Sequence, residues 1–369
     1  MLCKTIAMAM NTIPHIPDVR TDAFAIQMKN IIRLKEKDEY FMNIALQEAA
    51  KANHEVFPNP KVGAIVVVNN KIISSGYHKC YGEEHAEANA INKLDSSITN
   101  ATLYVTLEPC SHLGKRNPCT DIINSKMFSR VVIAANDPNP KASGGAEILR
   151  NNNIEVVENV CTEKSKKLNK RFFTFFEQKR PYVILKIAST LDGFIAEPNG
   201  HSKWITNDKS RQSVHKLRST CDAILVGRKT IEKDDPSLTS HGYGKDPRII
   251  IFDPKNKINK KYKVLNKNPI IFSNMDLKTN PQKNITHVLS ELYNKSYQTL
   301  LVEGGGETIS SFLDSDLFDE LHIYYAPKLI GNGKPLYTGY NTLTKDYKLR
   351  LHKVDHFDND IKMTFHKGI

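Results

Sequence analysis

The chain has 369 residues, 40% of them hydrophobic and 25% charged, and its formal net charge is +12. This length favours two domains, and the composition excludes extended disorder. No apolar run reaches the roughly 18–20 residues that span a bilayer. Six cysteines are too few for a disulfide scaffold, so we expect reduced thiols or metal ligands in a cytoplasmic protein with no membrane partner.

The positive charge raises the question of nucleic-acid binding. Its densest run, KNKINKKYKVLNKN at 255–268, interleaves lysine with asparagine and contains no arginine. Surfaces that bind a nucleic-acid backbone usually add arginine and stacking aromatic residues. We interpret the run as a solvated surface and expect no nucleic-acid partner.

Residues 1–37 contain a short apolar patch interrupted by asparagine and proline, without the cleavage site of a signal peptide. Asp18 and Asp22 argue against a transit peptide, which is usually poor in acidic residues. We expect a loosely ordered extension and assign it no function.

A regular hydrophobic pattern begins at Asp38, where residues 38–52 are amphipathic and predict a helix. Two β-branched runs in 62–78, joined by Asn69 and Asn70, predict a hairpin. Beyond them, helices are predicted at 82–94, 119–127, 144–153 and 162–176, and strands at 101–110, 130–135 and 154–160. This alternation predicts a layered α/β domain.

Pro181 opens a second series of elements, so we place a domain boundary between residues 180 and 181. Apolar runs predict strands at 181–190, 223–227, 248–252, 269–273, 299–305 and 320–329, with a helix at 208–219. No internal repeat relates the two halves, which indicates two different domains.

One histidine and two cysteines suggest a metal site in the first domain. His85 opens a predicted helix, Cys110 ends a predicted strand, and Cys119 starts the next helix. One imidazole and two thiolates would hold zinc and leave a fourth position for water. Glu87 would then transfer protons, as in the His-x-Glu and Pro-Cys signature of zinc-dependent base deaminases.

Two alternatives remain for this cluster: buried thiols beside a charged helix, or a structural zinc site completed by Cys80 or His112. The pattern also departs from the usual signature, because eight residues rather than two separate Cys110 from Cys119. The order of the three motifs nevertheless favours a catalytic zinc ion.

The blocks PNPKVGA (58–64), HAE (85–87), PCSHLGKRNPC (109–119) and DPNP (137–140) resemble the deaminase domain of the bifunctional riboflavin-biosynthesis family. The resemblance implies a cytidine-deaminase-like three-layer fold. It implies one zinc ion per chain, held by His85, Cys110 and Cys119, with Glu87 as the general acid and base. The implied substrate is 2,5-diamino-6-ribosylamino-4(3H)-pyrimidinone 5′-phosphate, and Asn59 would contact its pyrimidine, although Asn59 between two prolines is also an ordinary turn residue.

The second half contains a glycine run between a strand and a helix, LLVEGGGETISSFL at 300–313. Such a turn can approach phosphate oxygens, but this one lacks the G-x-G-x-x-G of a Rossmann site. The blocks STLDGFIA (189–196), HSKWIT (201–206) and GRKTIEKDDPSLT (227–239) resemble the reductase domain of the same family. The resemblance implies a dihydrofolate-reductase-like α/β fold and NADPH as the cofactor.

The resemblance also assigns contacts by position. The implied NADPH contacts are Ala188, Trp204, Thr206, Thr230, Asp234, Gly305, Gly306, Glu307, Thr308 and Ser311. The implied substrate contacts are Lys186, Ser202, Arg218, Leu238, His241 and Glu303. His241 stands where the family often has arginine, and the contact for the NADPH 2′-phosphate stays unplaced.

We therefore predict a bifunctional enzyme with an unassigned extension (1–37), a deaminase domain (38–180) and a reductase domain (181–369), which forms a homo-oligomer. A nucleic-acid-acting zinc deaminase with an accessory domain is the main alternative. In a third interpretation only one of the two domains is active.

Overall fold

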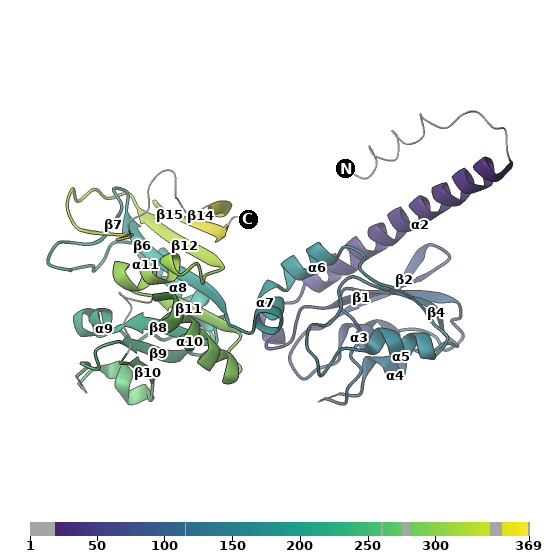
Figure 1. The fold of residues 1–369 in the computed structure, drawn as a ribbon, viewed down its shortest axis with the longest axis horizontal. Helices are drawn as coiled ribbons and strands as arrows, with labels where there is room; N and C mark the ends of the chain where they lie inside the picture. Colours follow the sequence, from purple (N-terminus) through teal and green to yellow (C-terminus); the bar gives the residue numbers. More distant parts are fainter. Residues whose placement is uncertain (1–18, 115, 260, 275–280, 340–348, 368–369) are drawn as a thin grey trace. The chain divides into compact units, whose positions relative to one another are not determined.

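The computed structural model describes residues 19–114, 116–259, 261–274, 281–339 and 349–367 (Figure 1). The chain divides into two compact units. The first contains the described residues up to Phe57 and Lys61–Leu168, and the second contains Pro58–Pro60 and the described part of Asn169–Ile369. Each unit is considered by itself.

The first unit is built on a five-stranded sheet with the order β2-β1-β3-β4-β5. The pairs of β1 with β2 and β3 are antiparallel, and β3, β4 and β5 run parallel. The strands are β1 Gly63–Val68, β2 Lys71–Tyr77, β3 Ala101–Val105, β4 Phe128–Ile133 and β5 Glu155–Val157. The helices are α2 Val19–Ala50, η1 His54–Val56, α3 Ala86–Ile91, α4 Cys119–Ile122, α5 Gly145–Asn151 and α6 Thr162–Leu168.

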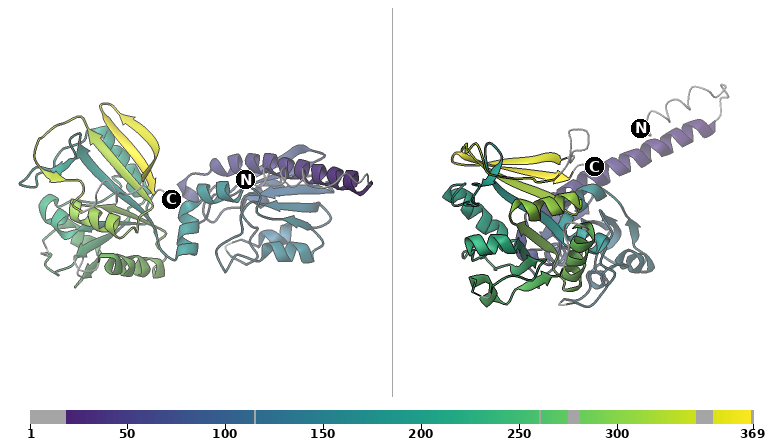
Figure 2. Two further views of the ribbon diagram at one scale, coloured as in Figure 1. Left: turned by 45° about the horizontal axis from the view of Figure 1, so that its top comes forward. Right: turned by 60° about the vertical axis from the view of Figure 1, so that its left-hand side comes forward.

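Both faces of this sheet are covered, as Figure 2 shows in two further views. Side chains of β1 alternate between the faces: Ile65 packs with Phe41 and Met42 of α2, whereas Val66 packs with residues of α3 and α5. The arrangement of helix, sheet and helices confirms the predicted three-layer domain. The hairpin is also confirmed, because Asn69 and Asn70 adopt the left-handed conformation, with φ of 49° and 63°.

Two expectations about helices were wrong. Residues 19–37 are not a loosely ordered extension, because α2 begins at Val19; residues 1–18 lie outside the described range. Beyond Pro17 the segment is free of glycine and proline and rich in helix-forming residues. The single helix expected at 162–176 is instead two helices, α6 and α7 (Lys170–Gln178), which are separated at the buried Asn169.

The second unit is built on an eight-stranded sheet with the order β10-β9-β8-β11-β6-β12-β15-β14. The strands from β10 to β12 run parallel, and β15 and β14 are added antiparallel. The parallel strands are β6 Tyr182–Thr190, β8 Ala223–Gly227, β9 Arg248–Asp253, β10 Ile270–Ser273, β11 Thr299–Glu303 and β12 Glu320–Ala326. The last two are β14 Leu349–Phe357 and β15 Asp360–Lys367, and β7 Phe194–Ala196 pairs separately with β13 Lys334–Pro335.

Helices cover both faces of this sheet as well. They are α7, α8 Asp208–Ser219, α9 Arg228–Asp234, η2 Lys263–Lys267, α10 Pro281–Asn294 and α11 Gly306–Asp314. One core joins α10 and α11 to one face, and the second core contains Ile231 of α9 and Val264 of η2 on the other. The six predicted strands are confirmed, whereas the hairpin of β14 and β15 was not predicted.

None of the helices in the described ranges is long and apolar enough to cross a membrane.

Candidate functional site

The three predicted metal ligands come together in the first unit. His85 is the residue before α3, Cys119 is the first residue of α4, and Cys110 lies in the turn after β3. The Nδ1 atom of His85 lies 3.2 Å from Sγ of Cys119 and 3.5 Å from Sγ of Cys110. All three ligand atoms lie within 4.8 Å of one another.

This geometry suits zinc. Bond lengths of about 2.0 Å to nitrogen and 2.3 Å to sulfur in a tetrahedron separate ligand atoms by about 3.5–3.8 Å. The distances from His85 are close to these values. The hydrogen bond between the two cysteines lowers the pKa of Cys110 and raises that of Cys119, so the pair without a metal ion favours one thiolate, on Cys110.

A closed structural zinc site would need a fourth protein ligand. Among the described residues, the cluster that could hold a metal contains only His85, Cys110 and Cys119. Neither Cys80 nor His112 belongs to it, and His112 is exposed. Three ligands leave one coordination position for water, as in catalytic zinc sites.

Glu87 lies beside the ligand cluster, in the first turn of α3, and only 3% of it is exposed. Burial raises the pKa of Glu87, and the neighbouring His85 opposes this shift. A carboxyl with a raised pKa holds a proton more readily than an ordinary glutamate, which suits general acid and base catalysis. Its position therefore suits a proton carrier.

Two acidic residues near this cluster were not singled out from the sequence. Burial raises the pKa of Asp137 to about 7, and its carboxyl lies within electrostatic range of Glu108, Cys110 and Glu87. Glu108 is 7% exposed and accepts hydrogen bonds from the segment that begins at Asp137. Both lie within motifs that the sequence displays, but their proximity depends on the pairing of β3 with β4.

Asn59 is half-buried in the irregular segment between η1 and β1. Its proposed contact with the pyrimidine stays a prediction.

In the second unit, a carboxylate and two cations from the predicted substrate contacts form one cluster. Glu303 accepts two hydrogen bonds from Arg218, Nε to Oε1 at 2.8 Å and Nη2 to Oε2 at 2.9 Å. Nζ of Lys186 lies 3.9 Å from Oε2 of Glu303. Burial alone would raise the pKa of Glu303, but the charges of Arg218 and Lys186 lower it to about 2.

The segment 237–241 lies beside this cluster, because Arg218 also donates to the carbonyl of Thr239 at 3.1 Å. Leu238 is buried, whereas His241 is exposed. The ring of His241 lies 4.0 Å from that of His215, centroid to centroid. His215 was not among the residues predicted from the sequence. Ser202 is half-buried, and its contact with the substrate stays a prediction.

The predicted cofactor contacts surround the N-terminus of α11. The backbone N–H of Gly305 donates to Oγ1 of Thr230 at 3.2 Å. A Cβ atom at Gly227 would lie 2.6 Å from Oγ1 of Thr308, and one at Gly306 would lie 2.9 Å from the carbonyl of Pro335. Glycine therefore permits the close backbone packing of this turn, and the helix N-terminus offers N–H groups to phosphate oxygens.

The remaining predicted cofactor contacts are less enclosed. Trp204 is 62% exposed, and the guanidinium of Arg211 lies 4.4 Å from its ring centroid. The backbone carbonyl of Thr206 accepts a bond from Arg211, and that of Asp234 accepts one from Lys203. The exposed Glu307 pairs with Lys229. Ala188 is half-buried on β6, and Ser311 lies on α11.

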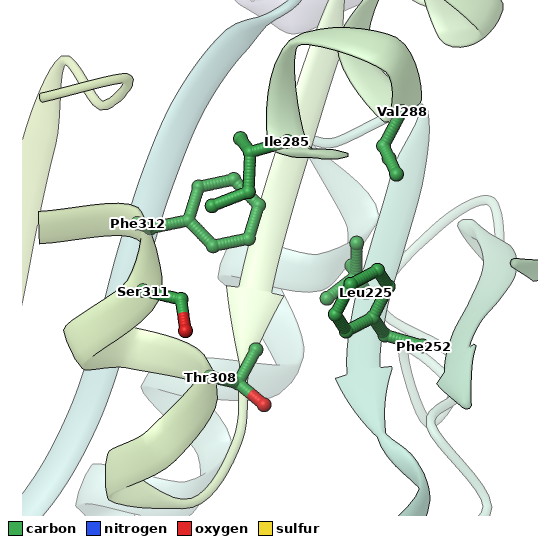
Figure 3. A pocket seen from close by; sticks show the side chains of 7 residues that line it. All are labelled: Leu225, Phe252, Ile285, Val288, Thr308, Ser311 and Phe312. Carbon is green, nitrogen blue, oxygen red and sulfur yellow. The ribbon is translucent and has the colours of Figure 1, made fainter. Parts of the chain in front are cut away.

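A crevice of about 210 Å³, including open solvent, lies beside the predicted cofactor contacts Thr308 and Ser311 (Figure 3). Its other lining residues are Leu225, Phe252, Ile285, Val288 and Phe312, all of which belong to the core between the sheet and the helices α10 and α11. Ligand sites usually measure about 300–1,000 Å³. We interpret the crevice as a packing seam rather than the cofactor site.

Known families match both units. The family described as "Cytidine and deoxycytidylate deaminase zinc-binding region" matches residues 35–135, and "RibD C-terminal domain" matches residues 181–363. The chain therefore combines a zinc-binding deaminase domain with a RibD C-terminal domain.

Similarity extends over most of the chain. The riboflavin biosynthesis protein RibD of Aquifex aeolicus is 40% identical over 352 residues, which cover 90% of this chain and 99% of that protein. The Escherichia coli protein of the same name is 31% identical, with 80% and 89% covered. A diaminohydroxyphosphoribosylaminopyrimidine deaminase/5-amino-6-(5-phosphoribosylamino)uracil reductase structure from Thermotoga maritima is 38% identical, with a TM-score of 0.76 and coverage of 90% and 99%.

The chain belongs to the RibD family of bifunctional deaminase–reductases in riboflavin biosynthesis. This membership confirms the predicted fold class and the two activities. It also confirms the predicted cofactors, zinc for the deaminase domain and NADPH for the reductase domain. It does not favour the alternative of a nucleic-acid-acting deaminase.

Proposed function

We propose that residues 38–180 deaminate 2,5-diamino-6-ribosylamino-4(3H)-pyrimidinone 5′-phosphate and that residues 181–369 reduce the product. In the first reaction, water adds at the carbon that bears the 2-amino group, the carbon–nitrogen bond breaks, and ammonia leaves. In the second, the ring-opened ribosylamine gains a hydride at C1′ and a proton, and becomes a ribityl chain. The observation that carries the proposal is the three-ligand cluster with the buried Glu87 beside it.

Zinc held by His85, Cys110 and Cys119 would supply an activated water at neutral pH. The carboxyl of Glu87 would hold the proton that the departing amino nitrogen requires, and burial, which raises its pKa, favours the protonated form. Asn59 would orient the pyrimidine ring by hydrogen bonding.

In the reductase site, NADPH would supply the hydride. In the cluster of Lys186, Arg218 and Glu303, Arg218 pairs with the carboxylate of Glu303, and burial lowers the pKa of Lys186. A bound substrate phosphate would favour the protonated form of Lys186, whose positive charge would then attract the phosphate. The turn at Gly305 and Gly306, with Thr230 and Thr308, would hold the cofactor phosphates. Trp204 would offer its exposed indole to the cofactor.

A cytoplasmic location and a homo-oligomer formed largely through the reductase domains complete the proposal. The few cysteines support the first of these, and the resemblance to the riboflavin-biosynthesis family supports the second. Size-exclusion chromatography with light scattering would test the oligomeric state.

The decisive experiment is incubation of the purified protein with the diaminopyrimidinone ribotide, with and without NADPH, followed by mass spectrometry. We expect the deaminated ribosyl compound without NADPH and the ribityl compound with it. An unchanged ribotide in both reactions would contradict the proposal. Production of only the first product would restrict the activity to the deaminase domain.

A further inference from the structure

Glu108 is a buried carboxylate for which the proposed chemistry has no use. It lies between β3 and Cys110 and is only 7% exposed. Its Oε1 atom accepts hydrogen bonds from the backbone N–H of Gly144 at 3.1 Å and of Ala146 at 3.0 Å, and its Oε2 atom accepts one from Asp137 at 3.1 Å. Burying a charge is costly unless such partners compensate it.

These bonds connect two segments that are distant in sequence. The segment 137–146 forms the irregular connection from β4 to the start of α5, and Glu108 holds both of its ends. Ser111 holds the middle, because its hydroxyl donates to the carbonyls of Ala142 at 3.2 Å and Ser143 at 2.6 Å. Glu108 and Ser111, whose side chains bind the segment, thus lie on either side of Cys110 in the sequence.

The two segments are also in direct contact. A Cβ atom at Gly145 would lie 1.9 Å from the carbonyl oxygen of Pro109, so only glycine allows the backbones to approach so closely. At the start of the segment, the carboxyl of Asp137 lies within electrostatic range of Cys110 and Glu87. The position of Asp137 relative to these residues therefore depends on the hydrogen bonds that hold the segment.

We propose that Glu108 is a positioning residue for deamination, which fixes the segment 137–146 against the Cys110 turn and so holds Asp137 within electrostatic range of Cys110 and Glu87. Glu108 acts through this segment and not through the metal. The inference rests on the proposed deaminase function.

Glu108→Gln tests the inference with minimal change in shape. The amide oxygen can still accept from Gly144 and Ala146, but the amide NH₂ meets the N–H of Asp137, so a donor replaces an acceptor. We expect a KM for the diaminopyrimidinone ribotide at least about tenfold higher, as expected for the loss of one buried hydrogen bond. The kcat should change less than the KM, zinc content should stay near one per chain, and reductase activity should persist.

Glu147→Gln is the matched control, because it removes the same charge from an exposed position on α5. It should leave the KM unchanged. A double variant supplies the test of mechanism: if Glu108 acts through Asp137, Glu108→Gln should add no further rise in KM to Asp137→Ala.

The inference would be overturned by loss of zinc in Glu108→Gln, by an equal effect of Glu147→Gln, or by independent effects that multiply in the double variant. Should Glu108→Gln fail to fold, Glu108→Asp removes the reach of the side chain while keeping its charge, and the same expectations apply. A wild-type protein that does not deaminate the ribotide would refute the proposed function itself. A wild-type protein that does so, with Glu108→Gln equally active, would refute only this inference.

Discussion

Glu303 provides the most quantitative prediction, because its ionisation is coupled to the stability of the second unit. The change is Glu303→Gln, which keeps the size of the side chain and removes its negative charge. Arg218 and Lys186 would then lose their shared counterion. We expect the variant to be less stable than the wild type near neutral pH and to approach it in acid.

The magnitude follows from the pKa. The folded protein lowers the pKa of Glu303 from its usual 4.5 to about 2, so the ionised carboxylate stabilises the fold above about pH 4.5, and this contribution is lost as the pH falls toward 2. At about 1.4 kcal/mol per pKa unit, the contribution is about 3 kcal/mol at pH 5 and about 1–2 kcal/mol at pH 3. The side chain is 12% exposed, so solvent screens it little.

The assay is urea unfolding followed by tryptophan fluorescence, since Trp204 is the single tryptophan of the chain and reports on the second unit. The difference in unfolding free energy between wild type and variant should fall by about half between pH 5 and pH 3. Asp358→Asn serves as the control, because Asp358 forms an exposed pair with Lys209 whose loss should cost little at either pH. A difference that is the same at pH 5 and pH 3 would refute the role of Glu303 ionisation.

Three further predictions concern the active sites. Cys110→Ser or Cys119→Ser should lose zinc, measured by atomic emission, along with deaminase activity, while reductase activity on pre-deaminated substrate survives; full metal occupancy in both would disprove the ligand assignment. Glu87→Gln should keep zinc but lose at least about 10²-fold in deamination rate, and loss of zinc instead would make Glu87 a ligand. If His241 contacts the substrate phosphate, His241→Arg should lower the reductase KM for the ribotide and leave the KM for NADPH unchanged, because a guanidinium can bind phosphate through two hydrogen bonds. An unchanged KM for the ribotide would leave the phosphate to Arg218 and Lys186.

The deaminase ligands could be predicted from the sequence because each lies at the end of a regular element. His85 and Cys119 open helices, and Cys110 follows the strand β3. The layered order of elements therefore brings all three to the carboxyl end of β3. Glu108 and Asp137 lacked such a signal. Their relation depends on the irregular connection between β4 and α5, residues 134–144, whose path is determined by its hydrogen bonds.

The hairpin of β14 and β15 was missed for a different reason. Its strands, LRLHKVDHF and DIKMTFHK, contain histidine and lysine at many positions and lack a run of β-branched residues. Five consecutive residues of β14 are exposed, so its sequence lacks the alternation of apolar and polar residues that predicts a strand. β15 pairs with β12, and β14 pairs with β15 at the edge of the sheet. This pairing stabilises the extended form, which illustrates how tertiary context determines strand formation.

The cluster of Lys186, Arg218 and Glu303 in the second unit depends on the register between two strands. Glu303 and Lys186 are paired residues on the adjacent parallel strands β11 and β6, and α8 brings Arg218 to the same carboxylate. No spacing in the sequence reveals this arrangement, because Lys186 and Glu303 are separated by more than a hundred residues. Its consequence is chemical: with its pKa near 2, Glu303 stays ionised near neutral pH and serves as an acceptor and counterion. We therefore expect the proton for the reduction step to come from solvent or another group, and Glu303 to act on the substrate through hydrogen bonding alone.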